Sequence, residues 1–179
     1  GLAGLVFLYR CTMVQDQSGE THGENKMPPL NPGANHGARF IHHDGMTVYT
    51  DRLLPDSARG KLPVVMIHGG GHSGACYLLT ADNRPGWAYR FADAGYPVWL
   101  PDWPGCGRSG DVPFADLTGE RVCAALGTVI AEAAAASPTG RVVLMTHSMS
   151  GALGWKLVEQ NRSLIERVVA VAPLSLIHI

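Results

Sequence analysis

The sequence predicts an α/β fold with a doubly wound, mostly parallel sheet, because short apolar runs alternate with helical patterns. Four predominantly apolar runs have the composition of strands that are buried on both faces of such a sheet. These runs cover residues 62–67, 97–100, 141–145 and 167–172. Helical spacing of apolar residues lies between them, over 87–94, 122–133 and 152–160. Strands and helices that alternate with short connections imply right-handed crossovers and parallel neighbours.

The two ends of the chain differ from this pattern. Residues 39–42 and 46–52 flank Asp44-Gly45, which predicts a hairpin and an antiparallel start. Residues 1–38 are expected to form a flexible arm, since much of this stretch is polar and rich in Gly, Pro and Asn. One domain is predicted over 39–173. The final residues, 174–179, resemble the translation of a transposon end used in sequencing libraries, so we treat them as a non-native tail.

The composition excludes several classes of function. The net charge is −1 and no basic patch is present, which argues against a nucleic-acid partner. No run is long enough to span a membrane. The four cysteines form no CxxC pair and the eight histidines show no ligand spacing, so we predict no metal and no cofactor. The compartment, cytoplasmic or secreted, and the oligomeric state stay open.

The strongest functional signal lies between the third apolar run and its helix, over residues 146–151. A nucleophile elbow is a sharp turn from strand to helix that exposes a hydroxyl at the top of the sheet. Its usual pattern is G-x-S-x-G, and here Thr146 and Ser150 replace both glycines around Ser148. We predict Ser148 as the nucleophile. The alternative is an ordinary Ser/Thr helix cap.

A glycine-rich loop follows the first apolar run, over residues 68–74. Acyl transfer builds negative charge on a carbonyl oxygen, which preorganised backbone N–H groups stabilise. We therefore predict the amides of Gly70, Gly71 and Met149 as an oxyanion hole. His72, on the same loop, is a candidate to line the pocket.

The same loop also satisfies G-x-G-x-x-G, at Gly69, Gly71 and Gly74, which is a dinucleotide-binding pattern. That pattern requires an acidic residue about 20 positions further on. Asp93 falls inside a predicted helix, and Asp102 comes too late. A dinucleotide-binding oxidoreductase is therefore kept as the less favoured alternative.

A third loop, residues 102–110, follows the second apolar run. Its two glycines at alternate positions predict a tight turn, which we expect to shape the pocket wall rather than to perform chemistry. Trp103 is the candidate to line the acyl or alcohol site.

Together these motifs resemble the α/β-hydrolase superfamily. The HGGG loop, the D-x-x-G-x-G-x-S loop and the serine elbow occur in that family's order, and the match covers about 39–173. The H-S-x-S-G elbow and the segment 82–87 resemble a group of bacterial esterases. The resemblance implies an α/β-hydrolase fold, incomplete at its C-terminus, in which Ser148 attacks a small-molecule carboxylic ester. Epoxide hydrolases and dehalogenases of this fold use Asp at that position, whereas lipase, lactonase, thioesterase and amidase activities stay open.

The resemblance also implies an acid and a histidine that follow the serine in the chain. Residues 170–173 contain no carboxylate, and His178 falls in the excluded tail. His147 is expected to be a buried packing residue, because neighbouring residues on such a turn diverge and its ring cannot approach the Ser148 hydroxyl to about 3 Å. We therefore expect the acid and base beyond Pro173. A non-catalytic hydrolase-like binding protein is a further alternative, favoured by the replaced elbow glycines.

This polypeptide by itself is expected to have no appreciable esterase activity, because it holds a nucleophile without its base. The measurement is hydrolysis of a p-nitrophenyl ester by the 179-residue chain. Turnover that disappears in Ser148→Ala would contradict this expectation.

Overall fold

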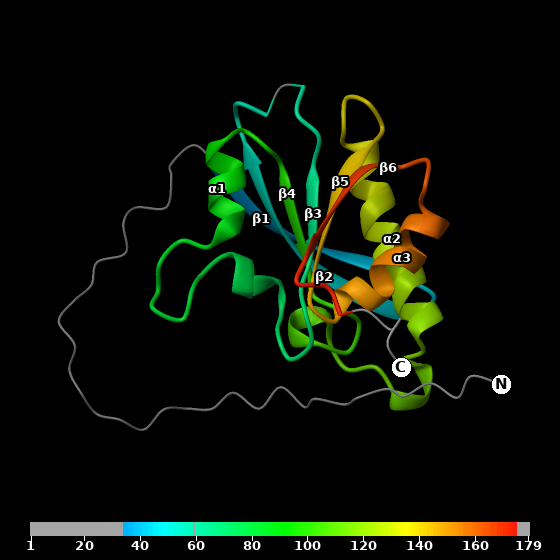
Figure 1. Cartoon of the computed structure of the whole chain (residues 1–179). Helices are drawn as coiled ribbons and strands as arrows, with labels where there is room; N and C mark the ends of the chain where they lie inside the picture. The colour runs from blue at the N-terminus through cyan, green and yellow to red at the C-terminus, as the bar shows by residue number, and fades with distance from the viewer. Residues whose placement is uncertain (1–33, 59, 175–179) are drawn as a thin grey trace, which may run out of the picture.

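A computed structural model describes residues 34–58 and 60–174. It has a mixed sheet in the order β1-β2-β4-β3-β5-β6 (Figure 1). Its strands are β1 Ala34–His43, β2 Met46–Pro55, β3 Val64–Ile67, β4 Val98–Pro101, β5 Val142–His147 and β6 Ile165–Val171. Its α-helices are α1 Trp87–Asp93, α2 Gly119–Ala135 and α3 Ser150–Gln160. Three 3₁₀ turns connect them: η1 Gly74–Tyr77, η2 Gly107–Ser109 and η3 Phe114–Asp116.

The parallel core confirms the predicted fold class. β3 pairs in parallel with β4 and β5, and β5 pairs in parallel with β6. β2 joins the sheet antiparallel to β4. The four predicted apolar runs all form strands, with ends that differ by at most two residues from the predicted limits.

The N-terminal hairpin forms where Asp44-Gly45 predicted it. Asp44 and Gly45 have φ of 44° and 75°, the positive values that a two-residue hairpin turn requires. The predicted arm was wrong in its last residues, because β1 begins at Ala34 rather than near 39. Residues 34–38 pair with 51–55 of β2, so ladder hydrogen bonds order a stretch whose composition favoured disorder. The rest of the arm, and the tail 175–179, lie outside the described residues.

Two apolar layers cover the two faces of the sheet, as a doubly wound fold requires. Successive residues of β3 alternate between them: Val64 packs in the cluster that includes α1, and Val65 packs in the cluster that includes α2 and α3. Figure 1 shows α1 on one side of the sheet and α2 and α3 on the other. Thr118 caps α2, since its side chain accepts a hydrogen bond from the Arg121 N–H.

Parallel strands place their carboxyl ends at one edge of the sheet. The residues that follow β3 and β4, and the turn after β5, therefore come together at that edge (Figure 1). These are the segments that the sequence motifs occupy. No helix in the part of the chain that the structure describes combines the length and the apolar character needed to cross a lipid bilayer.

Candidate active site

Ser148 occupies a strained turn between β5 and α3. Its φ is 53°, in the left-handed region that a non-glycine residue enters at a cost of about 1–3 kcal/mol. Backbone hydrogen bonds hold this conformation from both directions. The Ser148 N–H donates to the Val171 carbonyl at 3.0 Å, and the Ser148 carbonyl accepts from the N–H groups of Gly151 (2.9 Å) and Leu174 (2.8 Å). The end of β6 thus secures the turn.

Ser150 does more at the elbow than fit in place of glycine. Its side chain is fully buried, and its hydroxyl accepts a hydrogen bond from the His147 N–H at 2.7 Å. The same oxygen lies 2.9 Å from the carbonyls of Ile67 and His147, and its single proton donates to one of them at a time. Ser150 therefore ties the start of α3 to the ends of both β3 and β5.

Thr146, the bulkier replacement, is accommodated by a glycine further along α3. Thr146 is buried, and a Cβ at Gly154 would lie 3.1 Å from its Cγ2 atom. The small residue that the helix–strand contact needs is thus at 154 instead of at the usual elbow position. Gly151 serves a different contact, because a Cβ there would lie 2.6 Å from Pro173 Cβ.

The glycine loop lies directly against the elbow. A Cβ at Gly69 would come within 3.0 Å of Ser148 Cβ, and a Cβ at Gly70 would overlap the sulfur of Met149. Gly71 has a φ of 73°. The structure therefore places Gly69 beside Ser148 and Gly70 beside Met149, whereas a Cβ at Gly71 would have no heavy atom within 4 Å.

His68 is a buried, neutral histidine at the start of this loop. Its Nε2 atom accepts from the Trp103 N–H at 3.1 Å, and its Nδ1 atom lies 2.7 Å from the Gly69 carbonyl. A backbone N–H only donates and a carbonyl only accepts, so the proton is on Nδ1. Burial lowers the pKa of His68 below its ordinary value of 6.5, although the Gly69 carbonyl and Asp102 oppose this.

The other residues predicted near the site differ in how far they are buried. His72 is exposed, and its Nδ1 atom lies 2.8 Å from the Gly70 carbonyl. Trp103 is partly buried, packs against the larger core cluster and lies 5.5 Å from the His68 ring. The pocket-lining roles of His72 and Trp103 stay predictions. His147 is only half-buried, which corrects its prediction as a buried packing residue, because it ends β5 beside the glycine loop, where a Cβ at Gly69 would lie 3.2 Å from its Nδ1 atom.

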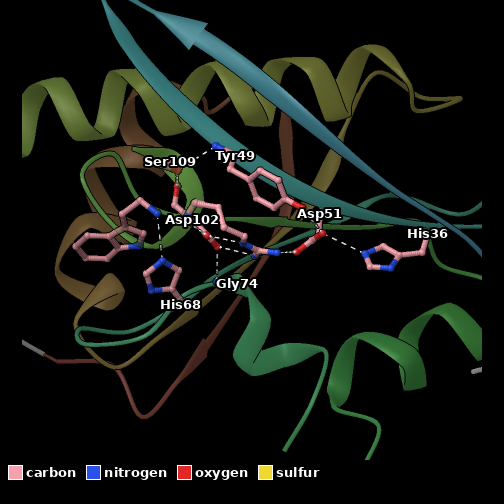
Figure 2. A network of polar contacts seen from close by, with 9 residues as sticks. His36, Tyr49, Asp51, His68, Gly74, Asp102 and Ser109 are labelled. Carbon is pink, nitrogen blue, oxygen red and sulfur yellow. Dashed lines mark hydrogen bonds and ion pairs between the residues drawn. The ribbon is translucent and has the colours of Figure 1, made fainter. Parts of the chain in front are cut away.

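Sequence reasoning missed the importance of Asp102, which follows β4. Its carboxylate is fully buried and accepts hydrogen bonds from the Gly74 N–H and from Arg108 (Figure 2). Burial lowers the pKa of the Arg108 guanidinium, but Asp102 and Asp51 outweigh this and raise that pKa above its ordinary value. The signal in the sequence was the D-x-x-G-x-G-x-S pattern of residues 102–109. Arg108 occupies its last variable position, six residues after Asp102.

Two hollows among the described residues lie away from the elbow. One, of about 790 Å³, is lined by Arg141, Ile165 and their neighbours at the opposite ends of β5 and β6. Another, of about 350 Å³, lies between α2 and α3 beside Gly127 and Asn161. The described residues also contain no group of three or more His, Cys, Asp or Glu side chains placed to hold a metal ion.

The match to a family model agrees with this fold. Residues 64–177 match the model described as the alpha/beta hydrolase family, and the chain belongs to that family. It is 24% identical over 182 residues to a probable secreted lipase from Fungal sp. (strain ATCC 74256). That match covers 73% of this chain and 50% of the lipase, so the chain spans about half the length of this relative.

Solved structures show the same fold at low sequence identity. A CIB-like hydrolase from Thermoplasma acidophilum is 21% identical, with a TM-score of 0.64 over 82% of this chain and 67% of that one. The thioesterase domain from the curacin biosynthetic pathway is also 21% identical, with a TM-score of 0.63 over 78% of this chain and 47% of that one.

The contact between Thr146 and Gly154 predicts a coupled effect on stability. Gly154→Ala should lower the free energy of unfolding by about 1 kcal/mol, because overpacking outweighs the gain in helix propensity. In a Thr146→Ser background, which lacks the Cγ2 methyl group, the same change should raise it by about 0.5–1 kcal/mol. Urea unfolding of the four proteins measures the coupling. Gly119→Ala is the control, since its Cβ would lie 3.9 Å from Leu153; equal effects of Gly154→Ala in both backgrounds would contradict the prediction.

Protonation of His68 should make stability depend on pH. The unfolded chain takes up this proton near pH 6.5 and the folded chain only at lower pH, so the free energy of unfolding should decrease as the pH falls below 6.5. The contribution reaches about 1.4 kcal/mol per pH unit. Urea unfolding between about pH 7 and 5 should show a shallower dependence in His68→Gln than in the exposed control His72→Gln. Identical slopes in the two variants would exclude this role for His68.

Proposed function

We propose that Ser148 is the nucleophile of a carboxylic ester hydrolase that works through an acyl-enzyme. The observation that carries the proposal is the strained turn at Ser148, which lies at the carboxyl end of β5 and against the glycine loop. A turn of this kind presents its hydroxyl at the top of the sheet, where ligands of α/β proteins bind.

The reaction has two steps. The Ser148 oxygen bonds to the acyl carbon while a base removes its proton, and the alcohol leaves with a proton returned by that base. Water then attacks the acyl-enzyme, which releases the carboxylic acid and restores the serine. The amides of Gly70, Gly71 and Met149 are the proposed donors to the oxyanion that forms in each step.

The base and its orienting carboxylate are expected outside the described residues. His68 is buried and bonded to the Trp103 N–H and the Gly69 carbonyl, and the Nδ1 atom of His72 lies against the Gly70 carbonyl. The Asp102 carboxylate is enclosed by Gly74 and Arg108. The family resemblance implies a triad acid and a histidine that follow Ser148 in the chain.

The relatives support acyl transfer over the two alternatives. A probable secreted lipase and a thioesterase domain are named for reactions at acyl carbons. A dinucleotide site would need an α-helix to begin at the glycine loop, but the loop leads into the four-residue 3₁₀ turn η1. The non-catalytic alternative drew on the replaced elbow glycines, and the contacts of Ser150 and Gly154 account for both replacements.

Substitution of Ser148 tests the proposal in the full-length protein. Ser148→Ala should abolish labelling by a fluorophosphonate and lower kcat on p-nitrophenyl esters by at least about 10³-fold, because the variant has no nucleophile. Ser163→Ala, at an exposed site far from the elbow, is the matched control and should keep both activities. Labelling or turnover that survives in Ser148→Ala would refute the assignment.

A further inference from the structure

The glycine loop is held at both ends by two consecutive residues of another loop. At its start, His68 accepts a hydrogen bond from the Trp103 N–H at 3.1 Å. At its end, the Gly74 N–H donates to Asp102 Oδ1 at 2.7 Å. The amides of the intervening glycines therefore depend for their position on where residues 102–103 lie.

The Asp102 carboxylate is an unusually firm anchor. It has no exposed surface and accepts four hydrogen bonds: one from Gly74, and three from the backbone N–H, Nε and Nη2 of Arg108, at 2.9, 3.0 and 3.1 Å. A buried carboxylate is tolerated only when it is paired and fully hydrogen-bonded. The two-pronged guanidinium contact also fixes its orientation. A displacement of the Asp102 carboxylate would therefore break several of these hydrogen bonds at once.

The two loops approach the Asp102 carboxylate so closely that Gly74 and Gly107 have no space for a side chain. A Cβ at Gly74 would lie 2.7 Å from the Leu100 carbonyl oxygen and 3.1 Å from Asp102 Oδ1. Gly107 has a φ of 54°, and a Cβ there would overlap Asp102 Oδ2 and lie 3.0 Å from Ser73 Cβ. Both glycines let the two loops close tightly on the carboxylate.

The anchor extends to the N-terminal hairpin. Arg108 reaches the buried Asp51 of β2 at 2.6 Å, and the hydroxyl of Tyr49 and the Nε2 atom of His36 lie 3.0 and 3.1 Å from Asp51 Oδ1 (Figure 2). The Arg108 guanidinium also lies 4.0 Å from the centre of the Tyr49 ring. Ser109 adds a second link, since its hydroxyl donates to the Asp102 carbonyl and accepts from the Tyr49 N–H. The hairpin thus supports the loop that holds the site.

We propose that Asp102, held by Arg108, is a positioning residue that sets the glycine loop for oxyanion binding, an inference that rests on the proposed acyl transfer. Asp102 acts through the Gly74 N–H and does not touch the reacting atoms. Loss of its charge should displace the glycine amides relative to Ser148 while the rest of the sheet stays folded.

Asp102→Asn in the full-length protein gives the kinetic test. An amide places an NH₂ group against either Gly74 or Arg108, both of which donate, so part of the anchor is lost. We expect kcat on a p-nitrophenyl ester to fall about 10–100-fold with KM changed less than about threefold, since an oxyanion contact acts in the transition state. The affinity of a boronic acid, which forms a tetrahedral adduct with the serine, should fall by the same factor as kcat/KM.

Hydrogen–deuterium exchange gives a test that does not depend on turnover. In Asp102→Asn, amides of residues 68–74 should exchange at least about 10-fold faster, while those of α2 keep their wild-type rates. Glu166→Gln is the matched control. It removes the carboxylate of the exposed Arg141–Glu166 ion pair, at the other end of the sheet, and should change neither exchange nor kinetics.

The outcomes separate the two proposals. Wild-type loop exchange or wild-type kcat in Asp102→Asn would overturn the positioning role. Faster loop exchange in Asp102→Asn, together with no Ser148-dependent turnover in the wild-type protein, would instead contradict the acyl transfer and leave the loop anchor standing. If Asp102→Asn does not fold, Arg108→Lys decides, because lysine keeps the charge but loses the two-pronged contact; unchanged loop exchange and kcat in that variant would overturn the role.

Discussion

Parallel pairing of β3 between β4 and β5 is the constraint on which the site depends. Because parallel strands end at the same edge, the pairing brings His68, Asp102 and Ser148 together from three distant parts of the chain. The apolar layers on both faces keep these strands in register, and α1 lies on the face opposite α2 and α3. Each feature of the elbow and the glycine loop then follows from short-range contacts at this edge.

At the elbow, backbone hydrogen bonds compensate for the strained conformation of Ser148. The positive φ of Ser148 is unfavourable for a residue with a side chain, and hydrogen bonds to Val171 and Leu174 offset it. The exchange of glycine for Ser150 adds a buried hydroxyl that joins two strand ends. The exchange at Thr146 is accommodated by Gly154. The turn at Ser148 therefore forms without the two usual glycines. Ser150 supplies hydrogen bonds at one of those positions, and Gly154 is the small residue that packs against the other.

Electrostatics stabilise the neighbouring loops in a different way. Two buried carboxylates, Asp51 and Asp102, share the single guanidinium of Arg108, and hydrogen bonds from the Tyr49 hydroxyl and the Gly74 N–H stabilise their negative charge further. The low dielectric of this region strengthens each contact and makes an unpaired partner costly. Such an arrangement favours one geometry over neighbouring ones. That is the property that a preorganised oxyanion site requires.

The amino-acid pattern alone was sufficient for the features with local causes. Apolar runs predicted β3 to β6, the Asp44-Gly45 pair predicted the hairpin turn, and the motif around Ser148 predicted a sharp turn from strand to helix, because each depends on neighbouring residues. The contacts of Asp102 were not predictable, since Gly74, and Asp51 of β2 through Arg108, join it only when two loops and a strand assemble. Gly154 likewise compensates for Thr146 only across a packed helix–strand contact. Composition also suggested disorder up to residue 38, whereas pairing with β2 orders the chain from Ala34. Hydrogen bonds and packing between distant segments decide these features, and no local pattern encodes them.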